Sequence, residues 1–363
     1  MSRSAVSVDF TSTAWNASSD LLAEGEILWS HQYWTSADAG LKMRRRDFIA
    51  ISTGALLCSR QVQAQIKTRR IVILAAASDP SSRLGEFRKR LGQLGYVEGR
   101  NIVLEVRSAE GNLDRLPAMA EAILRDGIVD AILAESTPAA MAAHQATKAV
   151  PIVAMVGVDP VGSGLASSLA RPGGNVTGIA IFADEANAKR VELVRELLPK
   201  AVRLAAVMAI NRGGTANSTS VVEAGGKLGF SVDVVVVRPD RLAEDLNPSR
   251  LASYDALLCV PDVVLASRKE EVIRLITQSN KPTVFAERQW VDIGGLASFG
   301  PDLHEASQHL ADQLARVLDG QNVSELPFER PTKFALALNL RTARAIGIEI
   351  PPILIARADE VIE

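Results

Sequence analysis

Residues 129–136 read Val-Asp-Ala-Ile-Leu-Ala-Glu-Ser, and this short apolar run decides the fold class. A second run, Tyr-Asp-Ala-Leu-Leu-Cys-Val-Pro at residues 254–261, has the same form, with an aspartate leading into apolar residues. A strand that is apolar on both faces is typical of a parallel sheet covered by helices on both sides. We therefore expect an α/β fold.

The surroundings of these two runs also repeat. Leu-Gly-Tyr at residues 94–96 comes before a predicted strand, and so does Leu-Gly-Phe at residues 228–230. Pro151 and Pro282 each open a later strand. Because the matched features follow in the same order at similar separations, the sequence predicts two copies of one α/β unit.

Predicted strands and helices alternate through both units, which indicates doubly wound parallel sheets. We expect two Rossmann-like lobes with a ligand cleft between them. Lobe 1 is expected at 70–176 plus about 300–330, and lobe 2 at 177–296 plus about 331–363. The predicted crossovers lie near 175–179, 294–299 and 331–334. The predicted strands are 71–77, 102–106, 129–133, 152–156, 176–182, 204–209, 232–237, 256–260, 283–285, 297–299 and 334–340.

The first residues differ from the rest. Residues 1–42 hold three of the four tryptophans and no sustained periodicity, and we expect an upstream artefact or a disordered segment. Residues 43–64 begin Met-Arg-Arg-Arg-Asp-Phe and continue with a short apolar run that ends near Gln-Ala. This order is typical of a secretory signal peptide, and the paired arginines resemble a twin-arginine signal. The alternative is an amphipathic helix that stays attached.

Charge and motifs exclude several functions. The formal net charge of −2 and the lack of a basic stripe speak against nucleic acid as a partner. No phosphate loop, dinucleotide fingerprint or nucleophile elbow is present. His304 and His309 are five residues apart, a poor spacing for one helix face, and no metal or other cofactor is expected. Cys259, within an apolar run, is expected to be a core residue.

Polar residues gather where the predicted strands end, and ligands of open parallel sheets bind beyond the carboxyl ends of the strands. We expect Ser136 and Thr137, at a helix N-terminus, to suit a carboxylate. Asp159 and Asp262 are expected to hold an ammonium from opposite lobes. The alternative for each acid is a cap or a turn. Trp290 is expected near the cleft. The full set of predicted ligand-binding residues is Ser78, Ser136, Thr137, Asp159, Asn211, Asp262 and Glu287.

One segment carries a family resemblance. Residues 150–165 read Val-Pro-Ile-Val-Ala-Met-Val-Gly-Val-Asp-Pro-Val-Gly-Ser-Gly-Leu, and residues 168–178 read Ser-Leu-Ala-Arg-Pro-Gly-Gly-Asn-Val-Thr-Gly. Together with Leu-Gly-Tyr-Val-Glu-Gly-Arg-Asn at 94–101, they resemble the ABC-transporter substrate-binding family whose better-known members take tryptophan or tyrosine. The resemblance extends over about residues 70–363.

The resemblance implies a type I periplasmic binding protein and no enzyme. Such a protein would bind a small amino-acid-like or carboxylate ligand and deliver it to permease and ATPase subunits, touching the membrane only through the permease. It would be exported to the periplasm. Two other classes stay open: a sensory ligand-binding protein, and an enzyme on the same architecture.

Overall fold

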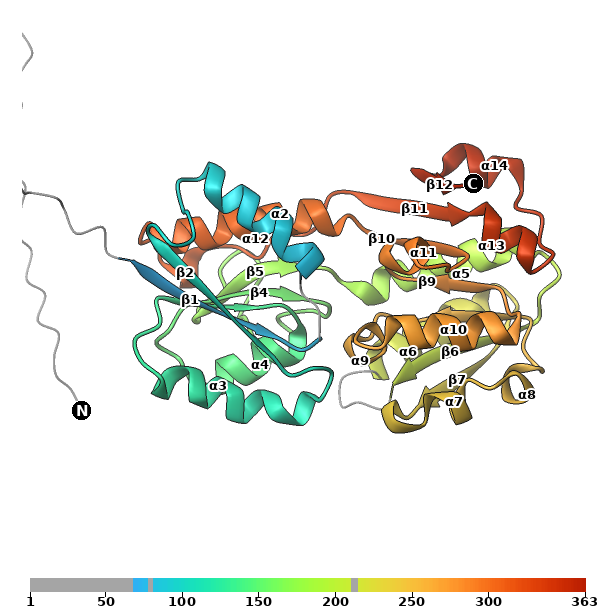
Figure 1. The fold of residues 1–363 in the computed structure, drawn as a ribbon, viewed down its shortest axis with the longest axis horizontal. Coiled ribbons are helices and arrows are strands. Elements are labelled where there is room, and N and C mark those ends of the chain that lie inside the picture. Colours follow the sequence, from blue (N-terminus) through green and yellow to red (C-terminus); the bar gives the residue numbers. More distant parts are fainter. Residues whose placement is uncertain (1–67, 78–80, 210–214) are drawn as a thin grey trace, which may run out of the picture. The chain divides into compact units, whose positions relative to one another are not determined.

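The computed structural model describes residues 68–77, 81–209 and 215–363. The predicted signal peptide and the segment before it lie outside these ranges, as do Ser78 and Asn211. The strands form two separate sheets, of five and seven strands, which define lobe 1 and lobe 2 (Figure 1). Within the described residues no helix combines the length and apolar composition needed to cross a membrane.

Lobe 1 is built on a fully parallel sheet in the order β2-β1-β3-β4-β5. Its helices lie on both faces, with α2 and α12 on one side and α3 and α4 on the other (Figure 1). This is the doubly wound arrangement predicted from the alternation of elements. The elements are β1 (Arg69–Ala75), α2 (Ser81–Gln93), β2 (Ile102–Ser108), η1 (Leu113–Arg115), α3 (Leu116–Arg125), β3 (Ala131–Ala134), α4 (Thr137–Ala146), β4 (Ile152–Val156), β5 (Val176–Ala180), α12 (Leu303–Leu318) and η3 (Val323–Glu325).

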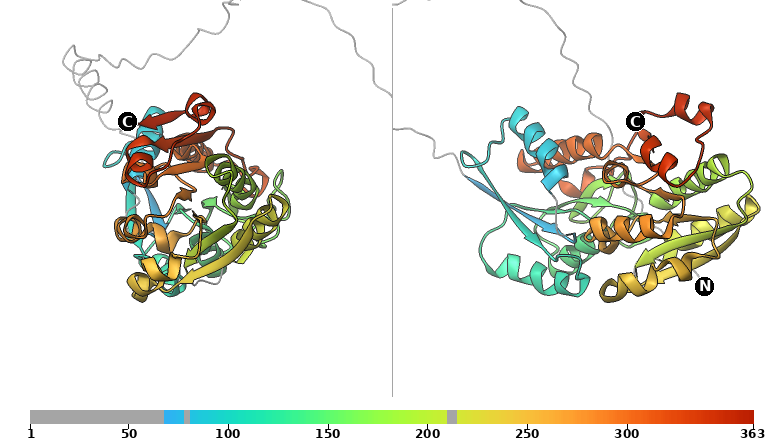
Figure 2. Two further views of the ribbon diagram at one scale, coloured as in Figure 1. Left: turned by 90° about the vertical axis from the view of Figure 1, so that its right-hand side faces the viewer. Right: turned by 45° about the vertical axis from the view of Figure 1, so that its right-hand side comes forward.

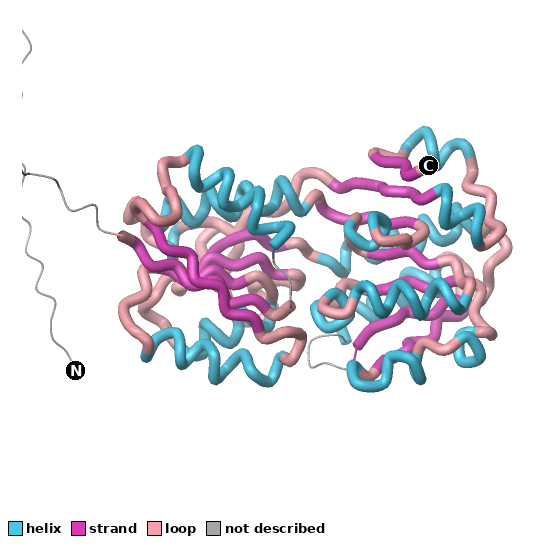
Figure 3. The backbone as a smooth tube through the Cα atoms, viewed as in Figure 1, coloured by secondary structure: helices cyan, strands magenta, loops and turns pink. Residues whose placement is uncertain are grey.

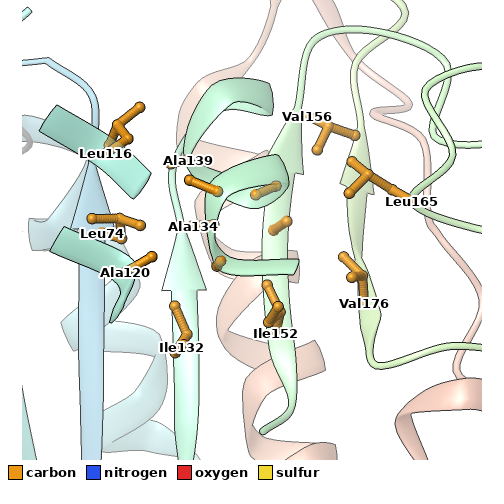
Figure 4. Packing of buried hydrophobic residues seen from close by; sticks show 14 of the residues in the cluster. Leu74, Leu116, Ala120, Ile132, Ala134, Ala139, Ile152, Val156, Leu165 and Val176 are labelled. Atoms are coloured by element: carbon orange, nitrogen blue, oxygen red, sulfur yellow. The ribbon is translucent and has the colours of Figure 1, made fainter. Parts of the chain in front are cut away.

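The apolar run at residues 129–136 contains β3, at the centre of this sheet. All four residues of β3 are buried, as are all five of β4 and of β5. Helices cover both faces, so alternate side chains pack into separate cores above and below the sheet. Figure 4 shows one of them, in which Leu74, Ile132 and Ile152 from neighbouring strands meet the α3 and α4 residues Ala120 and Ala139.

Lobe 2 has the sheet order β12-β11-β10-β9-β8-β6-β7. Helices α5 and α6 pack on one face and α7, α9 and α10 on the other (Figures 2 and 3). The elements are α5 (Ala183–Leu197), β6 (Arg203–Ala209), α6 (Thr215–Lys227), β7 (Ser231–Val237), η2 (Pro239–Arg241), α7 (Leu242–Asp245), α8 (Pro248–Leu251), β8 (Ala256–Cys259), α9 (Val263–Ala266), α10 (Lys269–Ser279), β9 (Thr283–Phe285), α11 (Gln289–Asp292), β10 (Ala297–Pro301), β11 (Phe334–Asn339), α13 (Leu340–Ala345), α14 (Pro352–Arg357) and β12 (Glu360–Ile362).

Two features of lobe 2 differ from the expectation. The late apolar strand at 334–340 is present as β11, but it pairs antiparallel with β10, so this sheet is mixed. Trp290 lies in the core, 5% exposed and stacked on Phe285 with 5.0 Å between ring centroids, and is not among the residues that line the cleft.

Three segments connect the lobes. β5 still pairs with β4, so the chain leaves the lobe 1 sheet only after Ala180, and the predicted boundary at 176/177 falls at the start of β5. β10 still pairs with β9 and β11, so the second crossing follows Pro301. The predicted crossovers at 175–179 and 294–299 are therefore several residues early. The third crossing, at 330–333, overlaps the predicted one.

The crossings touch one another. The Arg330 guanidinium lies 4.2 Å from the ring centroid of Phe182, which joins the third crossing to the first. The N–H of Asp302 donates to the carbonyl of Lys333 at 3.0 Å, which joins the second to the third. The three connections therefore form one bundle beside the cleft.

Candidate functional site

The carboxyl ends of the strands open onto a cavity of about 1390 Å³. Its described walls come from both lobes, chiefly the segments after β2, β3 and β4 in lobe 1 and those after β8 and β9 in lobe 2. Five predicted site residues lie in described parts of the chain, and all five line this one cavity. They are Ser136, Thr137, Asp159, Asp262 and Glu287.

Ser136 and Thr137 lie where β3 gives way to α4. Ser136 is the N-cap of this helix, and its Oγ accepts the N–H of Ala139 at 3.3 Å. Thr137 Oγ1 accepts the N–H of Gly157 at 3.0 Å, which ties the end of β3 to the end of β4. Both hydroxyl oxygens act as acceptors here, so each hydroxyl keeps its own hydrogen for a donor role.

The two aspartates hold backbone groups. Asp262 is the N-cap of α9, where its Oδ1 accepts the N–H groups of Val264 at 2.8 Å and Leu265 at 3.1 Å. Its Oδ2 accepts the N–H of Ala209 at 3.1 Å, at the end of β6. Asp159, which is exposed, accepts two N–H groups of the following turn through its two carboxylate oxygens. The structure therefore gives both side chains the capping role that the sequence left as the alternative.

A buried arginine is the part of the site that sequence reasoning missed. Arg190 lies about two turns into α5, is fully buried, and lines the cavity. Burial lowers the pKa of its guanidinium to about 10, and the nearby charge of Glu287 opposes that shift. The group is thus still a cation at neutral pH.

The missed signal is the helical position of Arg190. Ala186, Asn187, Leu193 and Val194 lie three or four residues from it and are all buried. That spacing puts Arg190 on the face of α5 that packs against the sheet. A charged residue on an apolar helix face requires a specific partner, because an uncompensated buried charge is costly.

Among the charged side chains of the described cavity walls, acidic ones outnumber basic ones. Only two basic side chains line these walls, Arg190 and Arg268, and the latter pairs with Glu271 at 2.5 Å. The acidic side chains at the walls are Glu110, Asp114, Glu135, Asp159, Asp240, Asp262 and Glu287. No aromatic side chain is found among the described lining residues. Among the described residues no group of His, Cys, Asp and Glu is arranged to hold a metal ion.

The lobes also meet at a second place. Leu113 of lobe 1 packs against a core of lobe 2, and Val263 of lobe 2 packs against a core of lobe 1. A Cβ placed on Gly111 would lie 2.4 Å from Ser267 Oγ, so the two backbones are in close approach there. We call this set of four residues the rim contact. All four of its members also line the cavity.

Comparisons with known proteins agree with this architecture. One relative is a tyrosine-binding protein of Clostridioides difficile (strain R20291), 27% identical over 275 residues, which are 72% of this chain and 76% of the relative. A solved structure from Streptococcus pneumoniae, an ABC domain in complex with L-Trp, is 25% identical with a TM-score of 0.72, covering 82% of this chain and 100% of that chain.

A third relative carries no ligand. It is a ligand-free, open substrate-binding protein with adhesive properties from Clostridium difficile, 26% identical, with a TM-score of 0.59 over 81% of this chain and 99% of that chain. The family model described as ABC transporter substrate binding protein matches residues 53–362, most of the sequence. The chain therefore belongs to the family of ABC transporter substrate-binding proteins.

Proposed function

We propose that the chain is the extracytoplasmic solute-binding component of an ABC importer, and that it binds a small amino-acid-like ligand between its lobes and delivers it to a permease. The observation that carries the proposal is the cavity, whose walls come from both lobes and include Arg190 and acidic side chains together. A zwitterion matches such a mixture of charges, because each of its ends finds an opposite partner.

Family and fold support this assignment. The family is one of substrate-binding proteins, and relatives of similar identity bind tyrosine or are solved with L-Trp. The chain also matches the L-Trp complex better than the open, ligand-free relative, at TM-scores of 0.72 and 0.59 and nearly equal identity. This difference supports a lobe arrangement nearer to the ligand-bound one.

The ligand's side chain is a separate question from its backbone groups. The described cavity walls carry no aromatic residue, and none occurs in residues 78–80 or 210–214, which follow the first strand of each unit. Aromatic rings usually stack on aromatic or apolar platforms. We therefore propose a ligand recognised mainly through its charged groups, with a side chain that need not be aromatic.

We assign roles to the predicted residues on this basis. Glu287 is proposed to receive the ammonium, and the hydroxyls of Ser136 and Thr137 to donate to the ligand from lobe 1. The carboxylates of Asp159 and Asp262 are proposed to frame the cavity, because backbone N–H groups already hold them. Ser78 and Asn211 are proposed as further contacts from their sequence positions alone.

We also propose a periplasmic location, reached through cleavage of the signal after Ala64. Intact-mass measurement of protein taken from the periplasm checks this, and a mature chain that retains Trp15 or Arg45 would contradict it.

The central test is the identity of the bound solute. Protein purified from the periplasm under native conditions is denatured, and the released small molecules are identified by mass spectrometry. The expected result is an amino-acid-like solute in a stoichiometric amount, and deletion of the gene should abolish uptake of that solute by cells. Turnover of the solute by the purified protein would instead indicate an enzyme.

A further inference from the structure

The guanidinium of Arg190 is only partly satisfied. Its Nε–H donates to the carbonyl of Phe299 at 2.7 Å, and its Nη1 donates to Asn187 Oδ1 at 2.6 Å and to the carbonyl of Ala183 at 3.2 Å. An arginine has five N–H groups, so both N–H groups on Nη2 remain. Among the described residues, Nη2 has no hydrogen-bond partner, although the side chain lines the cavity.

Such a group needs an explanation. Buried polar atoms in native proteins are nearly always hydrogen-bonded, and an unmet donor on a charged group costs more than one on a neutral group. Three acceptors, two in α5 itself and one in β10, fix the plane of the guanidinium, so Nη2 cannot turn away to find another partner. The cavity that Arg190 lines is the side from which a further partner can approach this side chain.

The nearby acid does not fill this role. Glu287 is close enough to act on the charge of Arg190, yet it does not hydrogen-bond to Nη2. Its own carboxylate accepts the amide N–H of Gln289. The two opposite charges face one cavity without pairing directly, which leaves room for a molecule that carries both charges.

We propose that Nη2 of Arg190 binds the carboxylate of a free α-amino acid, with the ammonium of the same molecule toward Glu287. The inference rests on the proposed function and names its substrate class: a zwitterion with an unblocked carboxylate. The proposal differs from the sequence-based prediction, which placed the ligand's carboxylate at the N-terminus of α4. There Pro138 has no N–H and Ser136 already takes the N–H of Ala139, which leaves few donors in the first turn.

The position of Arg190 links the ligand to the connections between the lobes. Ala183 directly follows the first crossing and Phe299 lies just before the second. One side chain thus holds a carbonyl from each of these segments and also lines the cavity. A carboxylate bound to Nη2 would give the guanidinium its last hydrogen-bond partner. Arg190 would then bind the ligand and at the same time hold the first two crossings in place.

The test compares each amino acid with its carboxamide, which keeps the ammonium and the side chain but loses the carboxylate charge. The twenty standard amino acids and their amides are screened by thermal shift, and binding of the hits is measured by calorimetry. Wild type should bind the acid at least about tenfold more tightly than the amide, as expected for a charge-assisted hydrogen bond. Equal affinities for acid and amide would overturn the proposal without any mutant.

Two substitutions then locate the effect. Arg190→Met keeps the length of the side chain and should lower acid affinity by about tenfold or more while changing amide affinity by less than about threefold. Arg195→Met is the matched control, since Arg195 lies in the same helix, also donates to backbone carbonyls, and does not line the cavity. It should leave the ratio of acid to amide unchanged. Arg190→Gln, which also lacks the charge, replaces Arg190→Met if the latter does not fold.

Glu287→Gln should weaken acid and amide alike, because both carry the ammonium. If Arg190→Met weakens acid and amide equally, Arg190 serves the fold only and the proposal fails. A copurified solute without any carboxylate would overturn the role of Arg190 and leave the proposed function standing. If no amino acid binds and no solute copurifies, the proposed function itself is refuted.

Discussion

Replacement of Asp262 tests whether its carboxylate stabilises the fold as a helix cap or binds the ligand's ammonium. The carboxylate accepts three backbone N–H groups, two in the first turn of α9 and one at the end of β6. Asp262→Ala removes all three hydrogen bonds. Loss of an N-cap costs about 1 kcal/mol, and a buried N–H left without an acceptor costs about 1–3 kcal/mol more. We therefore expect a loss of about 3 kcal/mol in the free energy of unfolding.

Asp262→Asn is the informative comparison. Asparagine is as good an N-cap as aspartate, so the Oδ1 contacts to Val264 and Leu265 persist. The amide nitrogen would replace Oδ2, however, and cannot accept the N–H of Ala209. We expect a loss of about 1–2 kcal/mol, between wild type and Asp262→Ala. Since Glu287 is proposed to receive the ammonium, amino-acid affinity should stay within about threefold of wild type, a change below 1 kcal/mol.

Urea unfolding measures the stability of the three proteins, and calorimetry with the amino acid that copurifies measures their affinity. The refuting result is an Asp262→Asn protein that is as stable as wild type but binds the amino acid more than about tenfold more weakly. That outcome would mean that the carboxylate contacts the ammonium directly, as the sequence alone suggested, and that the cap contributes little to stability.

Three further predictions concern other parts of the molecule. Asp245→Asn should destabilise the protein by about 2 kcal/mol at pH 7; the hydrogen bond from Arg238 lowers the pKa of this buried carboxyl, so its stabilisation is present above the unfolded pKa of about 3.9 and the gap in melting temperature should shrink as pH falls below that value. Gly178→Ala should prevent folding or cost several kcal/mol in the melting curve, because its φ is +140° and a Cβ would lie 1.9 Å from a carbonyl oxygen of β4. The double variant Gly111→Cys/Ser267→Cys should form a disulfide under oxidation, because the two Cβ positions lie 3.1 Å apart, a few tenths of an ångström below the usual range. A shift in gel mobility detects the cross-link, with each single variant as a control. Absence of the cross-link would show that the rim contact does not form in solution.

The sequence predicts the strands of both lobes well because their burial on both faces leaves a continuous apolar signal. β3 and β8 are fully buried, as their apolar runs require. The antiparallel pairing of β11 with β10 could not be predicted, because an apolar strand has the same composition in either direction. The exact crossings were also out of reach: β5 and β10 pair with neighbours right up to their last residues, and pairing partners are not visible in one sequence.

The candidate site likewise has residues that the sequence predicts and one that it does not. Strand-end positions led to five residues that line one cavity, since all parallel strands deliver their carboxyl ends to one edge. Arg190 was missed because it belongs to a helix and not to a strand end. Its helical spacing is nevertheless visible in the sequence, because Arg190 falls among the apolar residues of one face of α5. Trp290 shows the converse, a residue near a strand end that packs inward.

We propose that the rim contact and Arg190 together couple a small ligand to the arrangement of the two lobes. A ligand shifts an equilibrium between lobe arrangements only by its difference in affinity for them. Leu113 and Val263 bury apolar surface whenever the lobes meet, so part of the closing free energy comes from the protein itself. In the protein without ligand, the unsatisfied Nη2 of Arg190 carries a free-energy cost. The proposed carboxylate would remove that cost by accepting a hydrogen bond. If the cross-linked cysteine pair cannot bind amino acids, the rim contact must open before a ligand reaches the cavity; binding at the wild-type rate would show that entry does not pass the rim contact.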